Sequence, residues 1–190
     1  VPALGNTYGI IIENSGEAEN EIYKNDFEDL KVGIQAQGIN GRLSWTNSNS
    51  PSGLEFRCNR FYEEMITADI SVTSGRIREE VGSCFPVLFT PLTQRPAGNL
   101  FSYSSSPNHQ DFGINNLPVV DQIVRYKHHF DSPTVWPVEP LSYNSNMMVL
   151  TACANPQNPI YYDEDLSCPT RFSAPIIIRS IVSDYEEDLN

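Results

Sequence analysis

The sequence predicts a mainly β fold, an antiparallel sandwich or jelly-roll-like domain with one or two short helices and disulfide staples. Three observations predict it. Apolar and polar residues alternate with a period of two along most of the apolar segments. Twelve of the 14 prolines lie after position 85, where they leave no room for a long helix. Four cysteines occur in 190 residues.

The clearest strand lies at 66–73, where the apolar residues Ile66, Ala68, Ile70 and Val72 alternate with polar ones. The same alternation predicts a strand at 54–58. Further strands are predicted at 10–13, 32–36, 85–90, 123–130, 147–153 and 174–183. Asn40-Gly41, between the strand at 32–36 and Leu43-Ser44-Trp45, predicts a hairpin closed by a type I′ turn.

A helix is predicted over Gly16–Leu30, because Tyr23, Phe27 and Leu30 share one helical face and Asn14 stands where an N-cap would. Residues 118–124 suit either a short helix or a strand. The stretch 94–117 is rich in Ser, Asn, Gly and Pro and is predicted to be one long loop. No internal repeat is evident at any period.

We therefore expect an extended N-terminal segment at 1–13, which a neighbouring copy could accept, and a single mainly β domain at 14–190. The segment places Tyr8, Ile10 and Ile12 on one face, so it could complete the sheet of another copy. A homo-oligomer formed by strand exchange or edge pairing is the expected partner.

The chain begins at Val1 without an initiator methionine, which suggests that an export signal has been removed. An even number of cysteines is typical of an oxidising compartment, so the expected location is extracellular or at the cell surface. The net charge of −12, with few lysines, excludes a nucleic-acid partner. No apolar run approaches the ~20 residues that a membrane span requires.

All four cysteines, Cys58, Cys84, Cys153 and Cys168, are expected to be in disulfides. The short loops between neighbours in the sequence favour the pairs Cys58–Cys84 and Cys153–Cys168, although sequence alone leaves connectivity open.

The sequence carries no catalytic fingerprint and no metal-binding spacing, and no cofactor is expected. Its histidines are His109, His128 and His129. The carboxylates Asp163, Glu164 and Asp165 form a weak calcium candidate, with a solvated acidic loop as the alternative. A glycosidase pair could arise if Glu63 or Glu64 met Glu79 or Glu80 in space.

Three functions remain open. The first is a structural subunit of an extracellular assembly such as a filament, sheath or surface coat, without catalytic activity. The second is a secreted module that binds a glycan or a protein, because tyrosines are frequent in the predicted loops. The third is a secreted hydrolase that uses a carboxylate pair.

Overall fold

The computed structural model describes residues 7–42, 52–62, 67–84, 96–103, 106–115, 123–130, 136–155, 158–159, 162–163 and 167–168. The strands among these residues are β1 (Tyr8–Glu13), β2 (Asn20–Tyr23), β3 (Asp26–Phe27), β4 (Val32–Gln37), β5 (Leu54–Arg57), β6 (Arg60–Phe61), β7 (Ala68–Val72), β8 (Glu80–Val81), β9 (Gln110–Ile114), β10 (Val124–His129), β11 (Met148–Asn155) and β12 (Asn158–Pro159).

The strands pair in parallel, which shows that the predicted antiparallel sandwich or jelly roll is wrong. One sheet has the order β1-β4-β7-β9, and all three of its pairings are parallel. β10 pairs in parallel with both β8 and β11, and only the short β11–β12 pair among the described strands is antiparallel. Successive side chains point to opposite faces of any strand, so alternation arises wherever one face is buried and does not fix the direction of the neighbouring strand.

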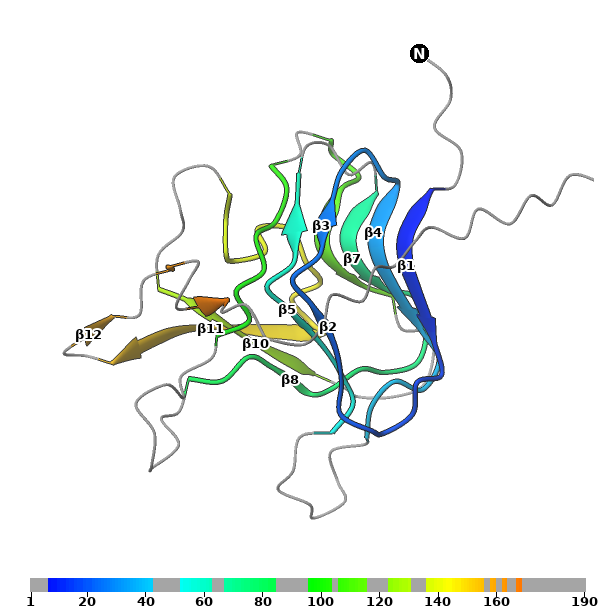
Figure 1. Ribbon diagram of the computed structural model, residues 1–190, viewed down its shortest axis with the longest axis horizontal. Helices are drawn as coiled ribbons and strands as arrows, with labels where there is room; N and C mark the ends of the chain where they lie inside the picture. Colours follow the sequence, from blue (N-terminus) through cyan, green and yellow to red (C-terminus); the bar gives the residue numbers. More distant parts are fainter. Residues whose placement is uncertain are drawn as a thin grey trace, which may run out of the picture.

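The chain winds as a three-sided β-solenoid. β1, β2 and β3 form the first coil, and they pair in order with β4, β5 and β6 of the second. The third coil contains β7, β8 and a segment in which Leu100 bridges Arg60. The fourth contains β9 and β10, and β11 belongs to the fifth. β1, β4 and β7 lie side by side in Figure 1, so each coil rests on its neighbours.

A short motif, X-Asn-x-Phe, recurs at one turn of three successive coils, at 24–27, 58–61 and 98–101. Its first residue is Lys24, Cys58 or Gly98, and each has a positive φ, of 57°, 59° and 67° respectively. The expectation that the chain has no internal repeat is therefore wrong. The copies share only Asn and Phe, and insertions of different length separate them.

The asparagines of this motif form a hydrogen-bonded column. Asn25 Nδ2 donates to Asn59 Oδ1 at 3.0 Å, and Asn59 Nδ2 donates to Asn99 Oδ1 at 3.1 Å. Asn59 Nδ2 also donates to the carbonyl of Ile22 at 3.0 Å. Asn59 and Asn99 are fully buried. The column thus supplies partners for polar groups that would otherwise be buried without any.

The phenylalanines form a second column, inside the solenoid. The rings of Phe27 and Phe61 stack with centroids 5.1 Å apart, and those of Phe61 and Phe101 with centroids 6.1 Å apart. Phe101 in turn contacts Tyr126 on β10. At Gly33 a Cβ atom would lie 2.6 Å from the Phe61 ring, so the close approach of ring and backbone requires glycine.

The predicted helix over Gly16–Leu30 is wrong, because this stretch contains β2 and β3. Ile22 and Phe27 are buried in the solenoid core, and Lys24 between them turns the chain with a positive φ. The apparent helical spacing arises because the two strands and their turn also bring apolar residues inward.

The predicted hairpin at Asn40-Gly41 is also wrong. Neither residue has the positive φ that a type I′ turn needs. Asn40 is instead fully buried, and its Oδ1 accepts a hydrogen bond from the backbone of Ser15 at 2.8 Å. The single long loop predicted at 94–117 is wrong as well, since it contains β9 and the third-coil segment at Leu100.

The strands predicted at 10–13, 32–36, 54–58, 123–130 and 147–153 are confirmed, and so is the strand predicted at 66–73, which is observed as β7 although Ile66 lies outside the described residues. Those predicted at 85–90 and 174–183 lie outside the described residues, as do positions 118–122 of the ambiguous segment.

We predict that Asn59→Ala lowers the free energy of unfolding by about 3 kcal/mol, because the polar groups of Asn25 and Asn99 that the Asn59 side chain binds lose their hydrogen-bond partner. Urea denaturation measures the loss. Asn146→Ala, at an exposed position, is the control and should change stability by less than about 0.5 kcal/mol. Equal losses in the two variants would contradict the role given to the column.

Candidate functional site

A buried polar cluster lies where the third and fourth coils meet, and it is the candidate site. Asp69 on β7 and Asp111 on β9 occupy neighbouring positions of adjacent strands, because Ala68 pairs with Gln110 and Ile70 with Phe112. His109 immediately precedes β9, and Ser102 follows the third-coil segment. The side chains of Asp69, His109 and Asp111 are 0%, 2% and 5% exposed.

Four polar atoms converge in this cluster. His109 Nε2 lies 3.1 Å from Asp111 Oδ1 and 3.5 Å from Asp69 Oδ1. Ser102 Oγ donates to Asp69 Oδ1 at 2.7 Å and lies 3.3 Å from His109 Nε2. The imidazole therefore stands between two carboxylates that belong to different coils.

The remaining carboxylate oxygens bind backbone N–H groups. Ser102 donates its backbone N–H to Asp69 Oδ2 at 2.7 Å. Leu141 and Ser142 donate theirs to Asp111 Oδ2 at 2.6 Å and 3.2 Å. The cluster thereby fixes two connecting segments against the sheet that contains β7 and β9.

Burial raises the pKa of Asp69 to about 7 from its ordinary 3.8. Desolvation disfavours the carboxylate and is the largest cause, while His109 and the hydrogen bonds from Ser102 lower this pKa and Asp111 raises it further. Asp69 therefore holds a proton well above the usual range of an aspartate.

The sequence prediction missed this cluster. Alternation placed Asp69 on the polar, solvent-facing side of its strand, and His109 and Asp111 were assigned to the predicted loop at 94–117. The His-x-Asp spacing at 109–111 was the available signal, but it indicates a site only once β9 is known to lie beside β7.

The predicted calcium residues are only partly described. Asp163 exchanges two hydrogen bonds with Ser167: its N–H donates to Oγ at 3.2 Å, and its carbonyl accepts from the Ser167 N–H at 2.7 Å. Glu164 and Asp165 lie outside the described residues, so calcium binding there stays a prediction.

The candidate glycosidase pair is likewise only half described. Glu79 forms an ion pair with Arg125, and Glu80 forms one with Lys127 at 3.1 Å. Glu63 and Glu64 lie outside the described residues.

All four cysteines form disulfides, as predicted, but the predicted pairing is wrong. The bonds join Cys58 to Cys168 and Cys84 to Cys153. Loop length in the sequence favoured neighbours, whereas the winding of the coils decides which cysteines meet. Cys58 occupies the turn after β5, and Cys84 follows β8 on the next coil.

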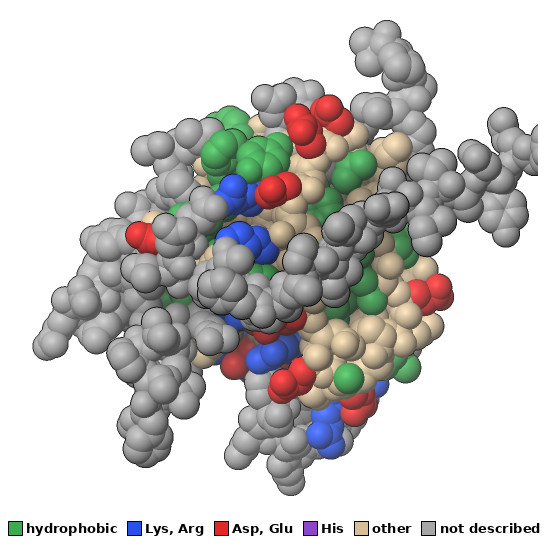
Figure 2. Space-filling view, in the orientation of Figure 1, with side chains coloured by type: hydrophobic (Ala, Val, Ile, Leu, Met, Phe, Trp, Pro, Cys, Tyr) green, Lys and Arg blue, Asp and Glu red, His purple; other side chains and the backbone are tan. Residues whose placement is uncertain are grey.

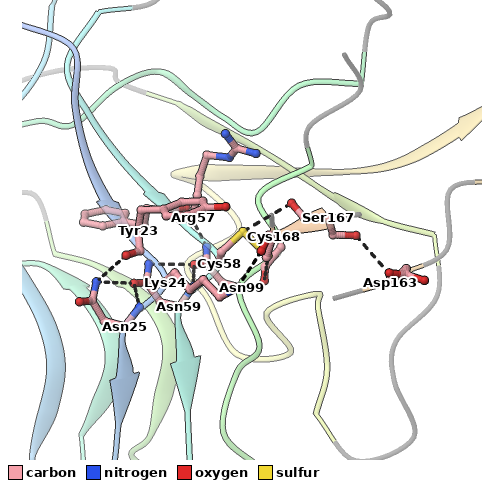
Figure 3. The surroundings of a disulfide bond; sticks show 12 residues. Tyr23, Lys24, Asn25, Arg57, Cys58, Asn59, Asn99, Asp163, Ser167 and Cys168 are labelled. Atoms are coloured by element: carbon pink, nitrogen blue, oxygen red, sulfur yellow. Dashed lines mark hydrogen bonds between the residues drawn. A yellow bond between two sulfur atoms is a disulfide. The ribbon is translucent and has the colours of Figure 1, made fainter. Parts of the chain in front are cut away.

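The Cys58–Cys168 bond attaches residues 167–168 to the turn that carries the asparagine column (Figure 3). Lys24, one coil below Cys58, donates from Nζ to the carbonyl of Cys168 at 3.0 Å. In Figure 3 Asn59 and Asn99 lie directly beside the disulfide. This arrangement connects a distant part of the chain to the first two coils.

His129, at the end of β10, has 1% of its surface exposed, and its Cε1 atom lies around Gly98 together with both sulfur atoms of this disulfide. Its ring meets that of Tyr162 edge-on, with centroids 5.2 Å apart, and neither ring nitrogen has a hydrogen-bond partner among the described residues. Desolvation, with smaller effects of His128 and Arg57, lowers the pKa of His129 to about 4. The imidazole is therefore neutral at pH 7 and acts as a packing group.

Comparisons with protein-family models, with curated proteins and with solved structures found no match. Within the described part of the chain, no helix has the length and apolar character needed to cross a membrane.

We predict opposite pH effects from Asp69 and His129. The stability that Asp69 contributes is complete below pH 3.8 and is lost as the pH rises to about 7, because the folded carboxyl keeps its proton longer than the unfolded one. The stability that His129 contributes is complete above pH 6.5 and is lost as the pH falls to about 4. Between about pH 4 and pH 6.5, a rise in pH therefore lowers the contribution of Asp69 to stability and raises that of His129.

Urea denaturation of the wild type and of two single variants, measured from pH 4 to pH 8, separates the contribution of Asp69 from that of His129. Asp69→Asn should become more stable relative to the wild type as the pH rises, by a few kcal/mol at most, and His129→Phe should do so as the pH falls. Parallel curves for wild type and Asp69→Asn would show that the Asp69 carboxyl does not titrate as described.

We also predict that a non-reduced digest yields one cross-linked peptide pair containing Cys58 and Cys168 and another containing Cys84 and Cys153. Mass spectrometry identifies the pairs, and a Cys58–Cys84 peptide in native material would contradict the coil arrangement. Replacing both Cys58 and Cys168 by Ser should cost roughly 4–5 kcal/mol in the chain-entropy model for a loop of about this length.

Proposed function

We propose that the protein is a non-catalytic structural subunit of an extracellular assembly, and that copies join where a coil of one stacks on the first coil of the next. The open edges of the first coil carry this proposal. β1, β2 and β3 each stand at the end of their sheet. Among the described residues, each pairs on one side only, with β4, β5 and β6 respectively.

Such an edge favours association because its N–H and C=O groups can pair with another strand. β1 already pairs with β4 of its own chain, which supports edge pairing rather than transfer of the whole predicted segment at 1–13. Ile10 and Ile12 pack against the core, and Tyr8 is half-buried. On the opposite face of β1, Ile11 is 53% exposed.

The columns inside the solenoid also end at this coil. Asn25 and Phe27 are the first members of the asparagine and phenylalanine columns. A further coil stacked beneath them would extend both columns and bury the remaining exposed part of Asn25, which is half-buried, whereas Phe27 is already only 5% exposed. This supports a solenoid coil, rather than an unrelated surface, as the partner.

Charge favours a head-to-tail contact. Between residues 8 and 31 the chain carries two lysines, Lys24 and Lys31, against seven acids, Glu13, Glu17, Glu19, Glu21, Asp26, Glu28 and Asp29. Two first coils placed face to face would repel each other, so the contact is expected to join the first coil of one copy to the opposite end of the next. Such head-to-tail contacts form an open filament unless the rotation between successive copies closes them into a ring. On the face shown in Figure 2, acidic and basic side chains are interspersed.

The burial of the candidate site supports a non-catalytic function. A glycosidase places two carboxyl groups on either side of a substrate bond, whereas the Asp69 and Asp111 side chains are 0% and 5% exposed. Both carboxylates also bind backbone N–H groups of connecting segments. The two disulfides fit an oxidising environment such as the cell exterior.

Sedimentation velocity of the full chain over a range of concentrations tests the proposal. We expect concentration-dependent association that Ile11→Lys weakens, because a lysine on an edge strand opposes edge pairing. Ile39→Lys is the matched control, since Ile39 is 49% exposed but bridges Arg76 of a later coil. A wild type that stays monomeric at all concentrations, or equal weakening by both variants, would contradict the proposal.

A further inference from the structure

We propose that Asp69, His109 and Asp111 bind one divalent transition-metal ion, with the Ser102 hydroxyl at the fourth position. The three residues each offer one ligand atom, and these atoms all lie within 4.8 Å of one another. This proposal is independent of the assembly proposed above.

The spacing of the donor atoms fits a small ion. A tetrahedral zinc ion with bonds of about 2.0–2.2 Å separates its ligands by roughly 3.3–3.6 Å. In the cluster His109 Nε2 lies 3.5 Å from Asp69 Oδ1, 3.1 Å from Asp111 Oδ1 and 3.3 Å from Ser102 Oγ. Ser102 Oγ and Asp69 Oδ1, which lie 2.7 Å apart, would have to separate by about 0.6–0.9 Å for all four atoms to surround one zinc ion.

The negative charge of the two buried carboxylates favours binding of a cation. Two carboxyl groups are buried here, and among the described residues His109 is the only basic side chain within 4.0 Å of either. A buried carboxylate without compensation is costly. A dication would neutralise both carboxylates at once, which protonation of Asp69 or of His109 alone does not.

The donor set selects the kind of ion. Calcium prefers six to eight oxygen ligands, whereas this cluster combines an imidazole nitrogen with few oxygens. Imidazole together with carboxylate suits zinc and similar ions. A full set of protein ligands with no solvent-facing position is typical of a structural site.

Binding would displace protons and involve no redox change. The ion needs the lone pair of His109 Nε2 and both carboxylates in their ionised form, so any protons on these atoms pass to solvent when the ion binds. The bound ion would connect the third and fourth coils and fix Ser102 and Leu141–Ser142 more firmly.

The test uses the full chain, treated with a chelator and dialysed, and titrated with Zn²⁺ in a calorimeter. We expect one site per chain and a melting temperature raised by about 5–10 °C when zinc is in large excess over Kd. Co²⁺ in place of Zn²⁺ should give the intense visible absorption of a tetrahedral complex.

His109→Gln and Asp111→Asn should each weaken zinc binding by at least about 100-fold, and Glu13→Gln, an exposed carboxylate far from the cluster, should leave it unchanged. Circular dichroism checks that each variant is folded. The proposal is wrong if the wild type binds no zinc at micromolar concentrations. It is equally wrong if the His109 and Asp111 variants bind zinc as tightly as the wild type.

Discussion

The register between successive coils is the constraint on which the rest of this structure depends. It is set at the turn that carries X-Asn-x-Phe, where Lys24, Cys58 and Gly98 adopt the same left-handed conformation and the following asparagines bond from coil to coil. A slip of one residue in any coil would turn the phenylalanine column away from the core. It would also separate Asp69 from Asp111 and carry Cys58 away from Cys168.

At one position of the first sheet, the residue type changes from coil to coil while the register of the strands stays the same. Gly9, Gly33, Asp69 and Asp111 occupy successive positions on β1, β4, β7 and β9, as the pairing of their neighbours shows. In the first two coils glycine lets a phenyl ring lie against the strand. In the next two, aspartate takes that place and gathers Ser102 and His109. The column therefore changes from apolar packing to a buried polar cluster without a change in register.

Local pattern was sufficient to locate strands but not to arrange them. The alternation at 66–73 and 54–58 identified β7 and β5 because burial of one face leaves a signal in any sheet. The coil repeat was hidden because Lys, Cys and Gly occupy its first position and the insertions between copies vary. The candidate site was missed for a related reason, since Asp69 and Asp111 become neighbours only through the pairing of β7 with β9. Composition predicted that the cysteines are oxidised, whereas their pairing required the coils.

The Cys58–Cys168 bond has a consequence for biosynthesis. It closes across 110 residues, so it cannot form until nearly the whole described chain has been synthesised. Domains fold from the N-terminus as they emerge, and Cys58 and Cys84 are therefore available to each other long before Cys153 and Cys168 arrive. A transient bond between these early thiols would have to be exchanged for the native ones. The yield of folded protein should therefore depend on the disulfide-exchange catalysts present where the chain folds.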